Sequence, residues 1–292
     1  MSINEPEYKN TELEELRLEA MRRKVVSVDP QTPKIKHVTI HMTDGVLIPK
    51  KDSHLFNSWR ITFFSAIALL TSLVLFKPKP YRDIFLVTIK GAPVTFQATI
   101  LAIIGAVLIG TVTGLGAVSK KRWVNVVSGV YVELIRGIPL LVQLIFIYYA
   151  MGRFFKIEGM IAAVTALAIC FGAYMGEIVR AGIQAIPQGQ MEAAIALGMS
   201  RSQAFRHVIL PQTVKVILPA IGNEMIALLK ETAVAGYVAV QDLTRAGNLI
   251  RNNTYDSFNP LMLVAVVYLV LVIGMTQLLG LLERRLRRSD KR

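Results

Sequence analysis

Charge and cysteine are both scarce in this chain of 292 residues. Charged residues make up 18% of it, and cysteine occurs once, at Cys170. Soluble globular proteins carry about 25% charged residues, so the low charge, together with 53% hydrophobic residues, excludes an ordinary soluble domain and a largely disordered chain. A single cysteine excludes an internal disulfide framework and a structural zinc site built on paired thiolates. The composition is typical of a membrane protein.

Motifs for nucleotide binding and catalysis are missing as well. No Gly-x-x-x-x-Gly-Lys-Ser/Thr sequence occurs, so the chain is not expected to bind ATP phosphates itself. No nucleophile has a base and an orienting group beside it, and His207 is expected to be a surface residue. His37 and His41 are four residues apart, but no thiol completes a zinc shell. The sequence therefore predicts no enzyme, no catalytic residue, no metal site and no cofactor.

Acidic residues are also few. The chain has 20 Asp and Glu against 33 Lys and Arg, which gives a net charge of +13. The basic residues lie largely between and beside the apolar runs, for example at 120–122 and in the last ten residues. Lys and Arg in such places are typical of the cytoplasmic flanks of membrane helices. A basic DNA-binding tail is the alternative, but no recognition fold accompanies it, so no nucleic-acid partner is expected.

Long apolar runs predict the membrane spans. A helix needs about 20 apolar residues to cross about 30 Å of hydrocarbon. Six spans are predicted, at residues 61–76, 91–119, 137–152, 159–176, from about 208 onward, and at 257–282. The fifth is interrupted by Pro211, Lys215, Pro219 and Glu224. The sequence therefore predicts an all-α, polytopic protein of the cell membrane with six transmembrane helices.

The basic clusters predict the orientation of these helices. With six crossings, Arg60, residues 120–122, residues 180–206 and the C-terminal tail share one side, which the excess of Lys and Arg marks as the cytoplasm. Lys77, Lys79 and Arg82 fall on the other side and are a minority exception. Both termini are therefore predicted to be cytoplasmic.

The chain divides into three predicted parts. Residues 1–58 form a mixed-charge cytoplasmic extension, in which Thr11 and Glu14 have capping-box spacing for one short amphipathic helix. Residues 59–83 hold the first span and a loop. Residues 84–292 form the main transmembrane domain.

Residues 184–211, between the fourth and fifth spans, are too polar for lipid and too regular for a loose linker. Pro187 ends the preceding helix, 190–197 favours a short helix, and Gly198 can provide its left-handed C-cap. Such a helix, held across the cytoplasmic face, could present a rigid surface to a soluble partner. The alternative is an interfacial helix that only orients the fifth span.

A second helix is predicted to follow directly. Ser200 and Gln203 have capping-box spacing for this helix. Pro211 lies near the start of the apolar run that leads into the membrane.

Ionisable residues within apolar spans are candidates for a transport pathway because they are costly to bury. Glu177 and Arg180 are three apart on one helix, so a self-satisfied pair is as good an explanation as a substrate role. Glu224 lies deeper and, with Asn223, is the candidate for lining a pathway for charged or zwitterionic solutes.

The loop also carries a family resemblance. The residues that match the EAA loop of ABC importer permeases are Glu192, Ala193, Ala194, Gly198, Val208, Leu210 and Pro211, with Val208 where Ile is usual. Residues 131–143, 173–183 and 228–232 are similar to the polar amino acid uptake subfamily. The resemblance runs from about Phe85 to the tail.

The resemblance implies a permease subunit of an ATP-driven importer of polar amino acids. Such a subunit pairs with a second permease copy or paralogue, binds two ATPase subunits and receives substrate from an extracytoplasmic binding protein. Glu192, Ala193, Ala194 and Gly198 are then expected to belong to the coupling helix that sits in a cleft of the ATPase. Two departures are the sixth span, since the subfamily usually has five, and Ile138 in place of the more usual Thr.

Two alternatives of other classes remain open from the residues alone. A secondary transporter would need inverted repeats or broken helices in two halves, and only the fifth span is interrupted in that way. A membrane scaffold would explain the N-terminal extension but not the regular loop at 184–211.

Overall fold

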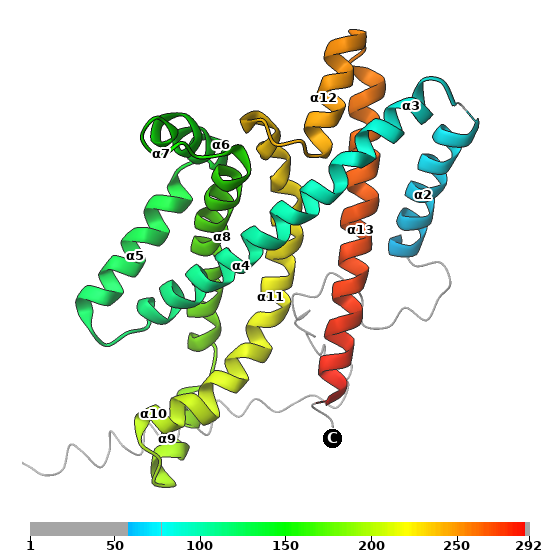
Figure 1. Cartoon of the computed structure of the whole chain (residues 1–292). Coiled ribbons are helices and arrows are strands. Elements are labelled where there is room, and N and C mark those ends of the chain that lie inside the picture. The colour runs from blue at the N-terminus through cyan, green and yellow to red at the C-terminus, as the bar shows by residue number, and fades with distance from the viewer. Residues whose placement is uncertain (1–57, 77, 290–292) are drawn as a thin grey trace, which may run out of the picture. The chain divides into compact units, whose positions relative to one another are not determined.

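The computed structural model describes residues 58–76 and 78–289, and every regular element in these two ranges is a helix (Figure 1). The helices are α2 (Ser58–Phe76), α3 (Pro78–Thr88), η1 (Ile89–Gly91), α4 (Ala92–Ala117), α5 (Arg122–Gly137), α6 (Leu140–Ile145), η2 (Phe146–Met151), α7 (Gly152–Phe155), α8 (Gly159–Gln184), α9 (Gln188–Ala196), α10 (Arg201–Ala204), η3 (Phe205–Ile209), α11 (Leu210–Glu231), η4 (Thr232–Val238), α12 (Leu243–Thr254) and α13 (Phe258–Ser289). The all-α prediction is confirmed. The predicted N-terminal helix after Thr11 and the His37–His41 pair lie outside the described residues.

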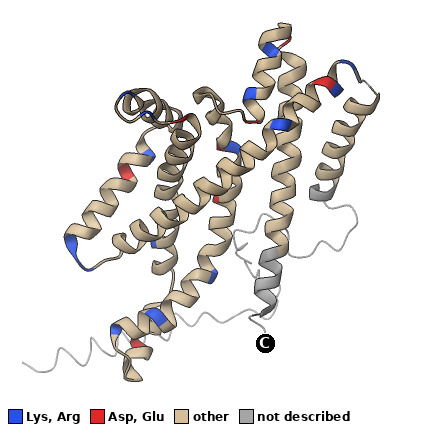
Figure 2. Cartoon of the chain, viewed as in Figure 1, with Lys and Arg blue, Asp and Glu red and all other residues tan. Residues whose placement is uncertain are grey.

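Four continuous helical segments are long and apolar enough to cross a membrane. They are Lys79–Ala117, Gly159–Gln184, Arg201–Val238 and Phe258–Leu281. Helix α4 and residues 258–281 of α13 contain no Lys, Arg, Asp or Glu (Figure 2). These segments confirm the second, fourth, fifth and sixth predicted spans.

The third predicted span is not a single straight helix. The segment 137–152 qualifies as a span only together with α5, and the two helices Arg122–Gly137 and Leu140–Phe155 meet at 98°. The cause lies in Pro139, which has no N–H to donate and disfavours helical dihedrals in the residue before it. Ile138 is accordingly extended, with φ −108° and ψ 129°.

The first predicted span is helical but short. Its apolar part, Ile61–Phe76, is shorter than the four spans above. The helix packs against α3 and α13. The described residues thus contain four spans, or five with the bent pair, and the sixth crossing stays a prediction.

Small residues hold α4 and α8 together at the centre of the helix array. Ala102, Ala106, Gly110 and Gly114 repeat every fourth residue on the buried face of α4. A Cβ added at Gly110 would come within 2.5 Å of the Met175 Cβ on α8, so only glycine permits this approach of the two backbones. Small residues at such spacing allow the close helix contacts that replace the hydrophobic effect inside a membrane.

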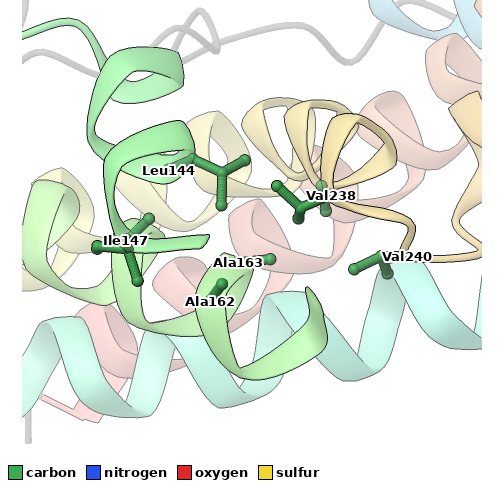
Figure 3. Close-up of a cluster of buried hydrophobic side chains, with 8 residues drawn as sticks. Leu144, Ile147, Ala162, Ala163, Val238 and Val240 are labelled. Carbon is green, nitrogen blue, oxygen red and sulfur yellow. The ribbon is translucent and has the colours of Figure 1, made fainter. Parts of the chain in front are cut away.

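A buried apolar cluster fixes the bent segment against the start of α8. Leu144 and Ile147 come from α6 and η2, Ala162 and Ala163 from α8, and Val238 from the end of η4 (Figure 3). The side chains of Leu144, Ala162, Ala163 and Val238 are all fully buried. The bend after Gly137 is therefore part of a packed core.

The two ends of the helix array differ in what they carry. The short helices α9 and α10 lie at one end of α8 and α11, and the C-terminal end of α13 points toward that same end (Figure 1). The segment α6–α7 and helix α12 lie at the opposite end (Figure 1).

Candidate functional site

A helical hairpin formed by α9 and α10 lies between α8 and α11 at one end of the array (Figure 1). Its first helix, α9, begins after Pro187, which is extended at φ −56° and ψ 134°. The helix ends in a Schellman motif: the N–H of Met199 donates to the carbonyl of Ala194 at 3.1 Å, and the N–H of Gly198 donates to that of Ile195 at 2.9 Å. Gly198 has φ +88°, which confirms the predicted left-handed C-cap.

The second part of the hairpin has the predicted capping box. The backbone N–H of Gln203 donates to Ser200 Oγ at 3.3 Å, and the backbone N–H of Ser200 donates to Gln203 Oε1 at 2.9 Å. The helix continues through η3 into α11, with Pro211 in its first turn. The Schellman motif and the capping box both lie at the turn between α9 and α10, so hydrogen bonds on either side of this turn fix α9 relative to the helix that leads into α11.

The four residues expected at a partner contact are not equivalent. Glu192, Ala193 and Gly198 are exposed, whereas Ala194 is 4% exposed. Helix α9 packs against η3 and α10, so the buried Ala194 side chain belongs to the inner packing of the hairpin. Leu197, an apolar side chain that the sequence reasoning did not include, is 82% exposed next to Gly198.

The second candidate region comprises charged groups within the spans. Glu177 and Arg180 on α8 form a salt bridge, and Arg180 Nη1 also donates to Gln184 Oε1 at 2.7 Å. The self-satisfied pair that the spacing allows is therefore present. Asn223 is exposed on α11, and Glu224, the next residue, is half-buried. Among the described residues, no hydrogen bond or salt bridge links Glu177 to Asn223 or Glu224.

Arg136, in the last turn of α5, is a further charged group beside the spans. Its guanidinium carbon lies 5.1 Å from the centre of the Tyr174 ring on α8. This distance is within the range of a cation–π interaction.

Gln143 is a functional candidate that the sequence reasoning missed. It is 8% exposed, and its Nε2 donates to the carbonyls of Ile135 and Ile138, both at 2.8 Å. These two carbonyls belong to the helix end and the extended residue beside the break at Pro139. A lone polar side chain in an apolar run is the signal that could have revealed it, because buried polar groups need partners.

A buried polar corner at the start of α12 was also missed. Asp242, 1% exposed, caps α12 by accepting from the backbone N–H of Arg245 at 2.8 Å. The N–H of Leu243 donates to Thr95 Oγ1 on α4 at 3.2 Å, and Arg245 Nη1 donates to the carbonyl of Gly236 at 3.1 Å. Burial raises the pKa of the Asp242 carboxyl above its ordinary value. The corner ties α12 to α4 and η4.

Metal ligands do not gather in the part of the chain that the structure describes. Within residues 58–76 and 78–289, no three His, Cys, Asp or Glu side chains are grouped so that they could hold an ion.

Comparison with known proteins defines the class of protein. Residues 106–288 match the family described as the inner membrane component of binding-protein-dependent transport systems. This stretch covers more than half of the chain and includes α5, the hairpin and α11. The chain therefore belongs to this family of multi-span permeases of ABC importers, whose members work with ATPase and binding-protein partners, and the secondary-transporter and scaffold alternatives are not supported.

Several individual members of the family are similar to this chain over most of their length. The chain is 32% identical to the putative glutamine transport system permease of Rickettsia felis, over 73% of this chain and 97% of that protein. It is 36% identical to the glutamine transport system permease of Escherichia coli (68% and 92% covered) and 35% identical to the arginine transport system permease of Bacillus subtilis (69% and 93%).

Two solved structures of ABC transporters have a fold similar to that of this chain. A crystal structure of an amino acid ABC transporter with histidines is 42% identical, with a TM-score of 0.65 over 74% of this chain and 98% of that one. The inward-facing methionine ABC transporter MetNI, at 21% identity and a TM-score of 0.60 over 72% and 99%, shares the fold.

Proposed function

We propose that the chain is the membrane subunit of an importer for polar amino acids and that α9 transmits ATP hydrolysis from a separate ATPase subunit to the transmembrane helices. The observation that carries this proposal is the closed turn between α9 and α10, made by the Schellman motif at Gly198 and the capping box at Ser200. Because α10 continues through η3 into α11, a turn closed in this way joins α9 rigidly to α11. Motion of a docked ATPase would then reach the spans without loss in a flexible loop.

The exposed face of α9 supports the docking role. Glu192 offers a charge, Leu197 offers an exposed apolar side chain, and the turn at Gly198 has open space around it. We assign the contact with the ATPase to Glu192, Ala193 and Gly198, with Ala194 holding the helix from inside. With this assignment the α9 end of the array and the C-terminal end of α13 lie on the cytoplasmic side of the inner membrane (Figure 1). We propose the same side for the N-terminus, because a crossing by α2 makes the number of crossings even.

The substrate assignment rests on the similar proteins. The relatives are named as permeases for glutamine and arginine, and the most identical of the solved structures reported above is of an amino acid transporter. We therefore assign polar amino acids to this chain, delivered by an extracytoplasmic binding protein to a pathway formed with a second permease copy or paralogue. Asn223, Glu224 and Glu177 are the candidates for lining it.

Charge reversal at Glu192 tests the proposal. Glu192→Lys should reduce copurification of the ATPase subunit and abolish coupled ATP hydrolysis and transport, because it reverses a charge at the contact while leaving the membrane core intact. Glu158→Lys, an exposed charge reversal at the other end of α8, should retain ATPase copurification and membrane abundance like the wild type. Wild-type copurification and transport in Glu192→Lys would show that α9 is not the coupling element.

A further inference from the structure

The turn between α4 and α5 carries the only run of three basic residues within residues 58–76 and 78–289. Its members, Lys120, Lys121 and Arg122, are all exposed. Their side chains make no hydrogen bond and no ion pair with any residue that the structure describes. No Asp or Glu occurs between residues 84 and 132, so the neighbouring chain does not neutralise this charge.

Hydrogen bonds hold the backbone of this turn in one conformation. The N–H of Ser119 donates to the carbonyl of Gly116 at 3.0 Å, and Ser119 Oγ accepts from the N–H of Lys121 at 3.3 Å. Asn125 on α5 donates through its Nδ2 to the carbonyl of Ala117 at the end of α4. Helices α4 and α5 also pack against each other. The basic side chains therefore extend from a fixed backbone.

The place of the turn along the chain puts it at the surface of the membrane. The apolar segment that contains α4 ends at Ala117, and the bent pair of helices that can form the next span begins at Arg122. Basic residues directly between two spans lie at the depth of the lipid headgroups. Trp123, the next residue, is 70% exposed, and tryptophan is enriched at this boundary. The turn lies toward the end of the array that carries α9 (Figure 1).

An apolar surface continues from the turn along α5. Val126, Val127 and Val130 are each more than half exposed, as are Trp123 and Leu134. The spacing of three or four residues places these side chains on one face of the helix. The same stretch therefore presents positive charge at the headgroup region and apolar side chains at the hydrocarbon. A phospholipid with an anionic headgroup is complementary to both parts.

We propose that the turn between α4 and α5 binds the phosphate of an anionic phospholipid in the cytoplasmic leaflet. Lys120, Lys121 and Arg122 contact the phosphate, because Lys and Arg donate charge-assisted hydrogen bonds to its oxygens. Trp123 lies beside the headgroup end of the acyl chains. The inference goes beyond the proposed function, since it involves neither an ATPase nor a transported solute. Only the choice of leaflet follows from the assignment of α9 to the cytoplasmic side.

Tryptophan fluorescence tests the proposal, because the full chain contains only two tryptophans, Trp59 and Trp123. A Trp59→Phe parent chain, purified without other subunits, is reconstituted in phosphatidylcholine vesicles. A minor fraction of the lipid is phosphatidylcholine or phosphatidylglycerol with acyl chains brominated near the headgroup, and bromine quenches tryptophan on contact. Phosphatidylglycerol should bind beside Trp123 at least about ten-fold more strongly than phosphatidylcholine, since three basic residues attract its charge.

Variants of the parent chain should show that this preference depends on the turn. The triple substitution Lys120→Gln, Lys121→Gln and Arg122→Gln should remove nearly all of it. The exchange Lys120→Arg, Lys121→Arg and Arg122→Lys should keep it, because the charges remain. The control Arg201→Gln with Arg206→Gln removes two exposed charges at the α9 end and should equal the parent. Equal quenching by brominated phosphatidylcholine in all variants verifies that each is inserted in the bilayer.

Equal quenching of the parent chain by the two brominated lipids would overturn the inference. So would an unchanged preference in the triple glutamine variant, which would place the anionic lipid elsewhere. A preference lost to the same extent in the control with Arg201→Gln and Arg206→Gln would indicate general surface charge and no bound lipid. If the triple glutamine variant keeps the preference but loses copurification of the ATPase, the turn is a protein contact. The first three results leave the proposed role of α9 untouched, because the lipid assay contains the permease chain alone.

Discussion

The turn of the hairpin requires glycine at position 198 because of its backbone conformation. A lack of room for a side chain is not the reason. A Cβ built there would meet no atom within 4 Å, yet φ is +88°. A residue with a Cβ reaches this region at a cost of about 1–2 kcal/mol, and a β-branched one is a clear outlier there. Gly189, in the first turn of α9, has equally open surroundings but an ordinary helical backbone. Substituting each glycine in turn therefore distinguishes the effect of an unfavourable φ from the effect of an added side chain.

Gly198→Val should reach the membrane in normal amounts and lose transport and coupled ATP hydrolysis, because the Schellman turn cannot form without strain. Gly189→Val adds the same side chain on the same helix and should retain both activities. Transport and ATP hydrolysis, each measured against membrane abundance, check this expectation. Equal activity of the two variants would show that coupling does not depend on the left-handed turn.

Gln143 acts at the break between α5 and α6 by satisfying two backbone carbonyls. Gln143→Met keeps the length of the side chain and removes both donors to Ile135 and Ile138. Losing both hydrogen bonds of this buried side chain should lower the free energy of unfolding by about 1–3 kcal/mol. The thermal midpoint of the purified protein measures this loss. Val142→Met, at the exposed neighbouring position, is the control, and equal midpoints for the two variants would remove the role assigned to Gln143.

At the scale of elements, the bent pair α5–α6 and the helix α2 differ most from a simple series of spans. The bend is fixed by the apolar cluster around Leu144 and Val238, so it is part of the fold (Figure 3). Helix α2 lies outside the region matched by the family and contacts α3 and α13. Whether α2 crosses the membrane decides on which side the N-terminal extension lies.

Thiol labelling tests the crossing by α2. In a Cys170→Ser background, single cysteines at Ser53 and Ser289 should both resist an impermeant thiol reagent in intact cells, because an even number of crossings keeps both on the cytoplasmic side. Permeabilised cells provide the control, in which both should react. Labelling of the cysteine at position 53 but not of that at position 289 would show that α2 does not span.

At the scale of the whole molecule, the family match covers only part of the chain. The family match begins at residue 106, and the relatives are covered almost completely by about 70% of this chain. The matched part of this chain therefore corresponds to nearly the whole length of these relatives. Residues 1–57 lie outside the described part and outside the family match.

Deletion of residues 1–50, with Lys51 and Arg60 kept as topogenic charges, should leave assembly and transport largely intact. The measurements are membrane abundance, copurification of the ATPase and amino acid uptake. Loss of uptake at normal abundance would show instead that the extension is essential for transport or regulates it.

Local features of the hairpin were predictable because they depend on near neighbours in sequence. The proline before α9, the glycine after it and the capping box at Ser200 and Gln203 each involve residues within about four positions, and all three are present as expected. The membrane spans at 159–184 and 258–281 were predictable for a similar reason, since lipid requires an unbroken apolar helix of a given length.

The sequence by itself determined the class of fold, four of the spans and the hairpin, because composition and short-range hydrogen bonding decide them. Only the tertiary structure decided that Ala194 faces inward, that α5 and α6 meet at 98°, and that Arg136 lies over the Tyr174 ring of α8. These features depend on which helix faces pack together over separations of tens of residues. That choice follows from the fit of small residues such as Gly110 against α8, which no local pattern specifies.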